Sequence, residues 1–191
     1  MIELSNEERA IVNAHPFAQI LSSQTSDSDF AELVYCPLLL TDQRSFLGHL
    51  SKGNPMIKAM EKSAIVKVIF SGPHGYISPR WHQEQVVPTW NYATVAIVCR
   101  TTMITDNTEK LAAMEKISYA FDPQWDFSNF NQKGNTKMVQ QMLSAITVFT
   151  LDIIEIKSKF KLSQNRSIAC RTAFKENLAR TGYHDLANIQ L

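Results

Sequence analysis

The stretch that decides the fold is Gly72-Pro73-His74-Gly75-Tyr76-Ile77-Ser78-Pro79-Arg80-Trp81-His82, followed closely by Val87-Pro88-Thr89-Trp90-Asn91-Tyr92. Its glycines and prolines predict turns. Rigid turns that present aromatic rings, amides and a guanidinium suit a flat heteroaromatic ligand. The same composition also fits a barrel edge that packs on helices or on a second subunit. The candidate binding residues here are Tyr76, Ser78, Arg80, Trp81, Trp90, Asn91 and Tyr92.

Strand patterns surround this stretch on both sides. Ala64–Phe70 is a short run rich in β-branched residues, and Trp90–Thr105 is a longer one. Ile154–Leu162 alternates apolar residues with charged ones, which is typical of a strand with one buried face. Three further strands are predicted at Phe17–Ser23, Ala31–Thr41 (with Pro37 at an edge or bulge) and Ser45–Ser51. Helices are predicted from Ser5 to Ala14, Pro55 to Lys62, Thr108 to Phe121, Met138 to Ile146 and Ser167 to Arg180.

Together these elements predict a mainly β fold with helices (α+β). About six strands joined in antiparallel fashion favour a closed or nearly closed barrel. Asp122–Gly134 reads as irregular, and Gly182 ends the last helix. We expect one domain over residues 1–191, with a C-terminal helix at about 167–181. No Gly-x-Gly-x-x-Gly follows a strand, so a βαβ dinucleotide fold is not indicated.

Composition narrows the class of protein. Hydrophobic residues make up 45% and charged residues 19% of the 191, which argues against disorder. The net charge of +1 and the solvated pattern of Lys157, Lys159 and Lys161 do not favour direct DNA binding. No apolar run has the length of a membrane span, and Met1–Glu8 is unlike a signal peptide. Three scattered cysteines suggest a reducing, cytoplasmic setting.

Chemistry-bearing motifs are few. Gly-x-Ser-x-Gly and His-Glu-x-x-His are absent, and the spacing of His74 and His82 matches no standard metal site. No catalytic residue is therefore predicted.

Two further stretches contain candidate anion-binding groups. Gly48–Pro55 places a hydroxyl and a cation before a predicted helix N-terminus, as phosphate sites do. An ordinary strand-to-helix turn would have the same pattern. In Lys161–Ser167, Ser163, Asn165 or Ser167 could cap the last helix, while Arg166 could clamp a phosphate or carboxylate.

These stretches carry a resemblance to a known family. The chain resembles the PaiB family, described as FMN-binding negative transcriptional regulators. The matching segments, in the family's order, are His15-Pro16, Gly48-His49 with Asn54-Pro55, Gly72-Pro73 with Tyr76-Ile77-Ser78-Pro79 and Trp81, Val87-Pro88-Thr89-Trp90-Asn91-Tyr92, and Lys161-Leu162-Ser163-Gln164-Asn165-Arg166. The chain departs from the family at Arg80 and His82, where a serine and a tyrosine are common.

The resemblance implies an FMN-binding split β-barrel of Greek-key type, related to the pyridoxamine-phosphate-oxidase-like flavoproteins. Such proteins are typically homodimers with the flavin at the subunit interface. By position in the fold, His49, Ser51 and Lys52 would contact the flavin phosphate, and Arg166 joins the candidate cofactor-binding residues.

Several functions stay open at the level of sequence. FMN binding with a regulatory role is the first, although no helix-turn-helix or basic patch supports direct DNA contact. A flavin-dependent oxidoreductase is an alternative. A haem-binding split barrel with His74 or His82 as ligand is another.

Overall fold

A computed structural model gives the fold for residues 2–23, 31–83 and 87–189. In these residues seven strands form one antiparallel sheet in the order β2-β1-β5-β6-β7-β4-β3. The sheet and its helices confirm the predicted α+β split-barrel class. The strands are β1 Phe17–Ser22, β2 Leu33–Pro37, β3 Leu39–Leu40, β4 Ser45–Ser51, β5 Ile65–Ile77, β6 Thr89–Ile104 and β7 Ile146–Lys161.

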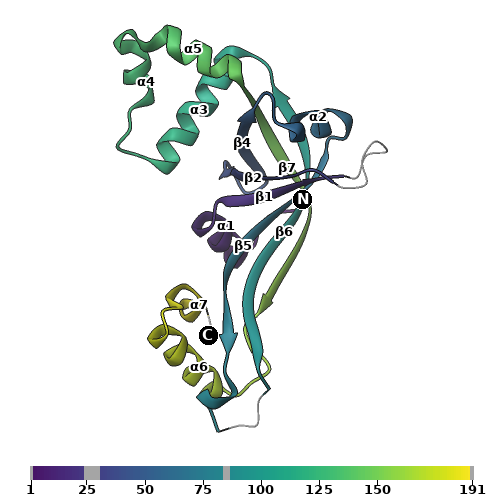
Figure 1. Ribbon diagram of the computed structural model, residues 1–191, viewed down its shortest axis with the longest axis vertical. Helices are drawn as coiled ribbons and strands as arrows, with labels where there is room; N and C mark the ends of the chain where they lie inside the picture. The colour runs from purple at the N-terminus through teal and green to yellow at the C-terminus, as the bar shows by residue number, and fades with distance from the viewer. Residues whose placement is uncertain (1, 24–30, 84–86, 190–191) are drawn as a thin grey trace.

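The barrel lies between helices α3 to α5 on one side and a long ribbon of strands on the other (Figure 1). Its two sides approach each other where the Cys36 thiol on β2 donates a hydrogen bond to the carbonyl oxygen of His49 on β4, at 3.3 Å. Inside, Phe46 and Phe70 are fully buried with ring centroids 5.2 Å apart. Gly48 is needed in this wall, because a Cβ there would lie 2.6 Å from the Leu38 side chain. Apolar packing therefore closes the barrel.

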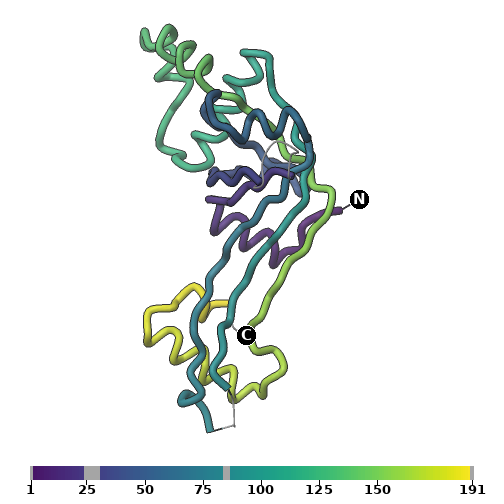
Figure 2. Tube along the Cα trace, turned by 45° about the vertical axis from the view of Figure 1, so that its right-hand side comes forward, coloured from purple at the N-terminus to yellow at the C-terminus, as the bar shows by residue number. Residues whose placement is uncertain are grey.

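Three strands run on beyond the barrel as a long ribbon. The strand β7 has 16 residues, which at about 3.3 Å per residue span roughly 50 Å. We call the part of β5, β6 and β7 farthest from the barrel (residues 72–77, 89–93 and 158–161) the ribbon end. Figure 2 shows the helices near the C-terminus lying beside it.

The turn predicted over Ser71–Pro79 is wrong, because β5 continues as a strand to Ile77. Its pairing with β6 shifts register between Ser71 and His74. Proline has no N–H to give to the ladder, and such residues are tolerated at irregularities of this kind. The Gly72-Pro73 pair thus marks a bulge in a strand.

Two other strand predictions differ from the structure. Ala31–Thr41 forms two strands, because Leu38 leaves the ladder and donates its N–H to the Pro16 carbonyl. The strand β7 begins at Ile146, well before the alternating pattern predicted. Val148, Phe149 and Leu151 are all fully buried, so this half of the strand lacks the alternation that identifies a strand with one exposed face.

The predicted helices are present with small shifts. Ser5 and Glu8 form the expected capping box at the start of the first helix. The Asp122–Gly134 region contains a short helix and then a kink, since the backbone of Lys133 and Gly134 is not helical. A helix after Gly182 was not predicted. The helices are α1 Asn6–Ala14, α2 Pro55–Lys62, α3 Asn107–Phe121, α4 Phe127–Phe130, α5 Thr136–Ala145, α6 Ile168–Arg180 and α7 His184–Asn188.

The helices α3 to α5 project from the barrel, while α6 and α7 cover one face of the ribbon end (Figure 1). Phe174 of α6 and Leu186 of α7 are buried in one small cluster with Ile77 of β5. Among the described residues, no helix combines the length and the apolar character needed to cross a membrane.

Candidate functional site

The sequence-predicted site residues fall into two groups at opposite ends of the sheet. His49, Ser51 and Lys52 lie at the barrel, where Ser51 pairs with Ile146 at the start of β7. The others lie at or beyond the ribbon end, where Tyr92 pairs with Lys161 at the end of the same strand. Almost the whole length of β7 separates the two groups.

The β4–α2 turn, residues 51–54, presents the first group. Its backbone is fixed by a hydrogen bond from the Lys52 N–H to the Ala145 carbonyl, at 2.8 Å, and by one from the Asn54 N–H to the Ser51 carbonyl, at 2.9 Å. The Asn54 side chain caps α2 by accepting from the Met56 N–H. Ser51 and Lys52 are exposed, so their hydroxyl and ammonium groups point to solvent from a fixed backbone.

His49 stands apart from its two neighbours. Its side chain is half-buried, and burial lowers the pKa of its imidazole below the ordinary value of 6.5. The neutral form is thus favoured, and Lys52 is the cation that the turn supplies near neutral pH.

Three aromatic residues share one face of the ribbon end. Tyr76 on β5 pairs with Trp90 on β6, and the two side chains are 42% and 50% exposed. The His74 ring lies 5.6 Å from the Trp90 ring, centroid to centroid. Tyr92, two residues along β6, points to the same face and is half-buried. The exposed rings form an aromatic surface, which we call the aromatic face.

Other predicted residues of this stretch have internal contacts. Ser78 is buried and its hydroxyl accepts a hydrogen bond from the Arg80 N–H. Trp81 is half-buried and meets the Phe174 ring edge-on at 6.4 Å. Asn91 is fully buried and accepts a hydrogen bond from the Ser163 hydroxyl at 3.0 Å. Of this group only Arg80 is exposed.

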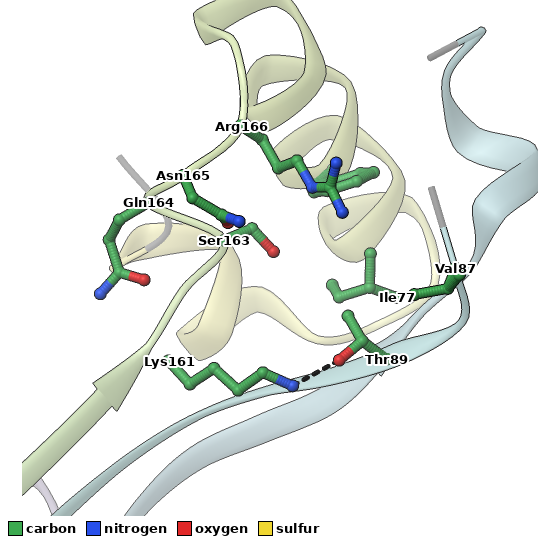
Figure 3. Close-up of a pocket in the computed structure, with 9 residues that line it drawn as sticks. Ile77, Val87, Thr89, Lys161, Ser163, Gln164, Asn165 and Arg166 are labelled. Atoms are coloured by element: carbon green, nitrogen blue, oxygen red, sulfur yellow. Dashed lines mark hydrogen bonds between the residues drawn. The ribbon is translucent and has the colours of Figure 1, made fainter. Parts of the chain in front are cut away.

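Arg166 lines a pocket at the tip of the ribbon, away from the aromatic face (Figure 3). Lys161, expected on a solvated strand face, lines the same pocket. Its place at the last position of the alternating strand, just before Ser163–Arg166, was the signal that could have identified it. Ser167 is the residue that caps α6, through a hydrogen bond from the Cys170 N–H at 3.1 Å.

Buried thiols and metal-ligating types of side chain are the candidate reactive groups of the described residues. Burial raises the pKa of the Cys36 thiol to about 11 and that of Cys99 to about 12, so neither is a thiolate near neutral pH. In the described part of the chain, no cluster of three or more His, Cys, Asp and Glu side chains could hold a metal ion.

Comparison with known proteins bears on the cofactor. Residues 3–155 match the family described as "Putative FMN-binding domain". The chain is 34% identical over 131 residues to the protease synthase and sporulation protein PAI 2 of Bacillus subtilis, a match that covers 66% of this chain and 60% of that protein. An uncharacterized protein of Emericella nidulans, AN0679, is 27% identical over 180 residues, which cover 74% of this chain and 70% of that one.

Solved structures share the fold. The FAD and heme binding protein of Mycobacterium smegmatis superposes with a TM-score of 0.61 at 14% identity, over 93% of this chain and 78% of that chain. At that identity the likeness concerns the fold alone.

Proposed function

Since the chain belongs to the PaiB-type family of FMN-binding domains, we propose that it binds FMN as a homodimer, with each flavin held between two copies of the chain. The observation that carries this proposal is that Ser51 and Lys52 lie at the barrel, whereas the aromatic face lies at the ribbon end, almost the whole length of β7 away.

The β4–α2 turn fits a flavin phosphate. It offers the Ser51 hydroxyl, the Lys52 ammonium and the N-terminal end of α2, which together are the donors and positive charge that phosphate groups bind. No carboxylate occurs between Gly48 and Ile57 that would repel an anion. His49, being half-buried and favoured as neutral, would support the turn from behind.

The aromatic face fits the isoalloxazine ring. Tyr76 and Trp90 expose much of their rings, and Tyr92 continues the surface along β6. Flat aromatic ligands stack on such side chains in offset or tilted arrangements. Arg80 lies exposed beyond the end of β5.

A single chain cannot bring both parts to one FMN. The turn and the aromatic face are separated by the length of β7, roughly 50 Å along the strand, which is far longer than an FMN molecule. An antiparallel pair of chains would place the turn of one copy beside the aromatic face of the other. The two parts then form one site, and each copy completes the site of its partner.

The outer surface of the barrel supports a second copy. Phe17, Leu33 and Tyr35 are 62%, 52% and 52% exposed, and the Phe17 and Tyr35 rings stack at 5.5 Å. Adjacent exposed apolar side chains of this size are typical of protein–protein contacts. A second copy would cover them.

Bound FMN would supply electron or hydride transfer, and this chain's residues would bind and orient it. No described side chain is assigned a catalytic role. The proposal is therefore a flavin-binding protein whose enzymatic activity, if it has one, comes from the cofactor.

The test compares FMN with riboflavin, which lacks the phosphate. Purified protein is titrated with each ligand while flavin fluorescence and the mass of the complex are followed. We expect saturable FMN binding, one flavin per chain in a dimer, and weaker riboflavin binding. Absence of FMN binding at tens of micromolar ligand, or tight binding by a monomer, would contradict the proposal.

A further inference from the structure

The pocket that Arg166 lines lies at the tip of the ribbon, where β5, β6, β7 and α6 meet. Its volume is about 160 Å³. Figure 3 shows Arg166 and Ser163 on one side of the pocket and Ile77, Val87 and Thr89 on the other. The residues that line it include Ile77, Thr89, Lys161, Ser163, Arg166 and Phe174.

The loop that carries these polar groups is held rigidly. The Leu162 N–H donates to the Gln164 side-chain oxygen at 2.9 Å, and the Gln164 amide donates to the Phe160 carbonyl at 2.6 Å. The Arg166 N–H closes a turn onto the Ser163 carbonyl at 3.0 Å. The glutamine side chain thus braces the end of β7 and fixes the path of the chain into α6.

Ser163 has a conformation that needs an explanation. Its φ is 59°, in the left-handed region that residues with a Cβ rarely adopt. Among the described residues it is the one non-glycine position with a positive φ. This backbone turns the Ser163 hydroxyl toward Asn91, to which it donates at 3.0 Å. Observed strain of this kind is concentrated at ligand-binding sites, where the surrounding structure maintains it.

Two positive charges meet in this pocket. Lys161 reaches across its floor and donates to the Thr89 hydroxyl, while Arg166 extends into it from above (Figure 3). None of the described residues that line it carries a carboxylate. Within the part of the chain that the structure describes, the Arg166 guanidinium makes no hydrogen bond or ion pair, although its residue is half-buried. The half-buried Arg166 guanidinium and the exposed Lys161 ammonium, both bordering one pocket, favour an anion.

The remaining walls limit the size of the ligand. Ile77 and Phe174 are buried and give the pocket apolar lining. The pocket has a volume of about 160 Å³, which suits one charged head group with a small apolar portion.

We propose that this pocket binds the anionic head group, phosphate or carboxylate, of a small ligand, and that it is separate from the site of the flavin phosphate. Arg166 and Lys161 provide the charge, and Ser163 and Thr89 provide hydroxyl groups. The proposal does not depend on flavin binding, because every group involved belongs to one end of one chain.

The experiment is a calorimetric titration of the full, flavin-free protein with three probes: inorganic phosphate, phenyl phosphate and benzoate. We expect saturable binding of at least one probe, and preference for a phosphate or for benzoate identifies the head group. Arg166→Gln should weaken the preferred probe about tenfold or more, because a charge-assisted hydrogen bond is lost. Arg180→Gln, the same charge change at an exposed position of α6, should leave it unchanged.

A further variant tests whether the two anion sites are separate. Lys52→Met, which changes the turn proposed for the flavin phosphate, should keep a saturable probe site of unchanged affinity, whereas Arg166→Gln should weaken that site. Loss of the site in Lys52→Met, no saturable binding of any probe, or an equal loss in Arg180→Gln would overturn the proposal. If the chain binds no FMN, the anion titration alone still decides whether the pocket at the tip of the ribbon binds an anion. Melting curves check that the variants are folded.

Discussion

The barrel and the ribbon end are held together in different ways. The barrel has one continuous apolar core, to which β1, β2, β4, β5, β6 and β7 contribute together with α1 and α2. At the ribbon end a small separate cluster joins β5 to α6 and α7, and side-chain hydrogen bonds such as that of Ser163 to Asn91 fix the loop beside it. Apolar burial dominates the first region and polar contacts shape the second.

This difference suggests a division of roles. The barrel buries enough apolar surface to determine whether the chain folds. The ribbon end holds its cations and aromatic rings in place with less burial, as expected for a part of the chain that binds ligands. Substitutions in the two regions should therefore separate loss of global stability from loss of ligand binding.

The largest effect is expected from truncating a buried aromatic side chain. Phe70→Ala should lower the free energy of unfolding by about 3–5 kcal/mol, since it leaves a cavity in the barrel. Phe174→Ala should lower it less, because α6 can detach from the ribbon while the barrel stays folded. Urea unfolding measures the free energy of unfolding of each variant. Amide hydrogen exchange, compared between α6 and β6, reports whether α6 detaches while the barrel stays folded. Equal losses with uniform exchange would show that the two regions unfold as one unit.

The next effect concerns the flavin phosphate. Lys52→Met should weaken FMN binding about tenfold or more and leave riboflavin binding unchanged, since only FMN carries the phosphate that the ammonium would contact. Lys58→Met is the matched control, because Lys58 is exposed on α2, just beyond the turn. Fluorescence titration gives both affinities. A similar loss of FMN affinity in the two variants would show that Lys52 does not contact the flavin phosphate.

Local signals in the sequence predicted much of the barrel. The ranges Ser45–Ser51 and Pro55–Lys62 match β4 and α2, and the capping box of Ser5 and Glu8 is present. These elements depend on neighbouring residues, so their pattern is sufficient. The continuation of β5 through Gly72 and Pro73 was missed because its pairing with β6 overrides the turn preference of those residues.

The candidate site was predicted by residue type but not by arrangement. Composition identified Tyr76 and Trp90, and strand pairing then placed them side by side. It could not show that Asn91 is buried against Ser163, since that contact joins segments far apart in the chain. The distance between Lys52 and the aromatic face likewise depends on the length of β7, whose inner half gives no alternating pattern.

A smaller effect should come from the strained loop of the ribbon end. Ser163→Ala and Ser163→Gly both remove the hydroxyl that donates to Asn91, but only glycine adopts a positive φ without steric cost. The glycine variant should therefore be more stable than the alanine variant by about 1–2 kcal/mol. Thermal unfolding of the two proteins measures the difference. If the alanine variant were as stable as the glycine variant or more stable, the backbone of Ser163 would not be strained. One observation that supports the anion pocket would then be lost.

The smallest expected effect is a change in the free energy of unfolding with pH, caused by His49 in the barrel. Burial lowers the pKa of His49 in the folded chain from its ordinary value of 6.5. Above pH 6.5 the residue is neutral in both states, so it adds no pH dependence. As the pH falls below 6.5, the unfolded chain binds a proton that folded His49 still excludes, and the free energy of unfolding decreases until the pH reaches the folded pKa. His49→Gln removes this contribution, so the stability difference between the two proteins should change between pH 7.5 and 5 by less than about 1.4 kcal/mol per pH unit. Urea unfolding at several pH values checks this, and parallel curves would mean that His49 titrates alike in both states.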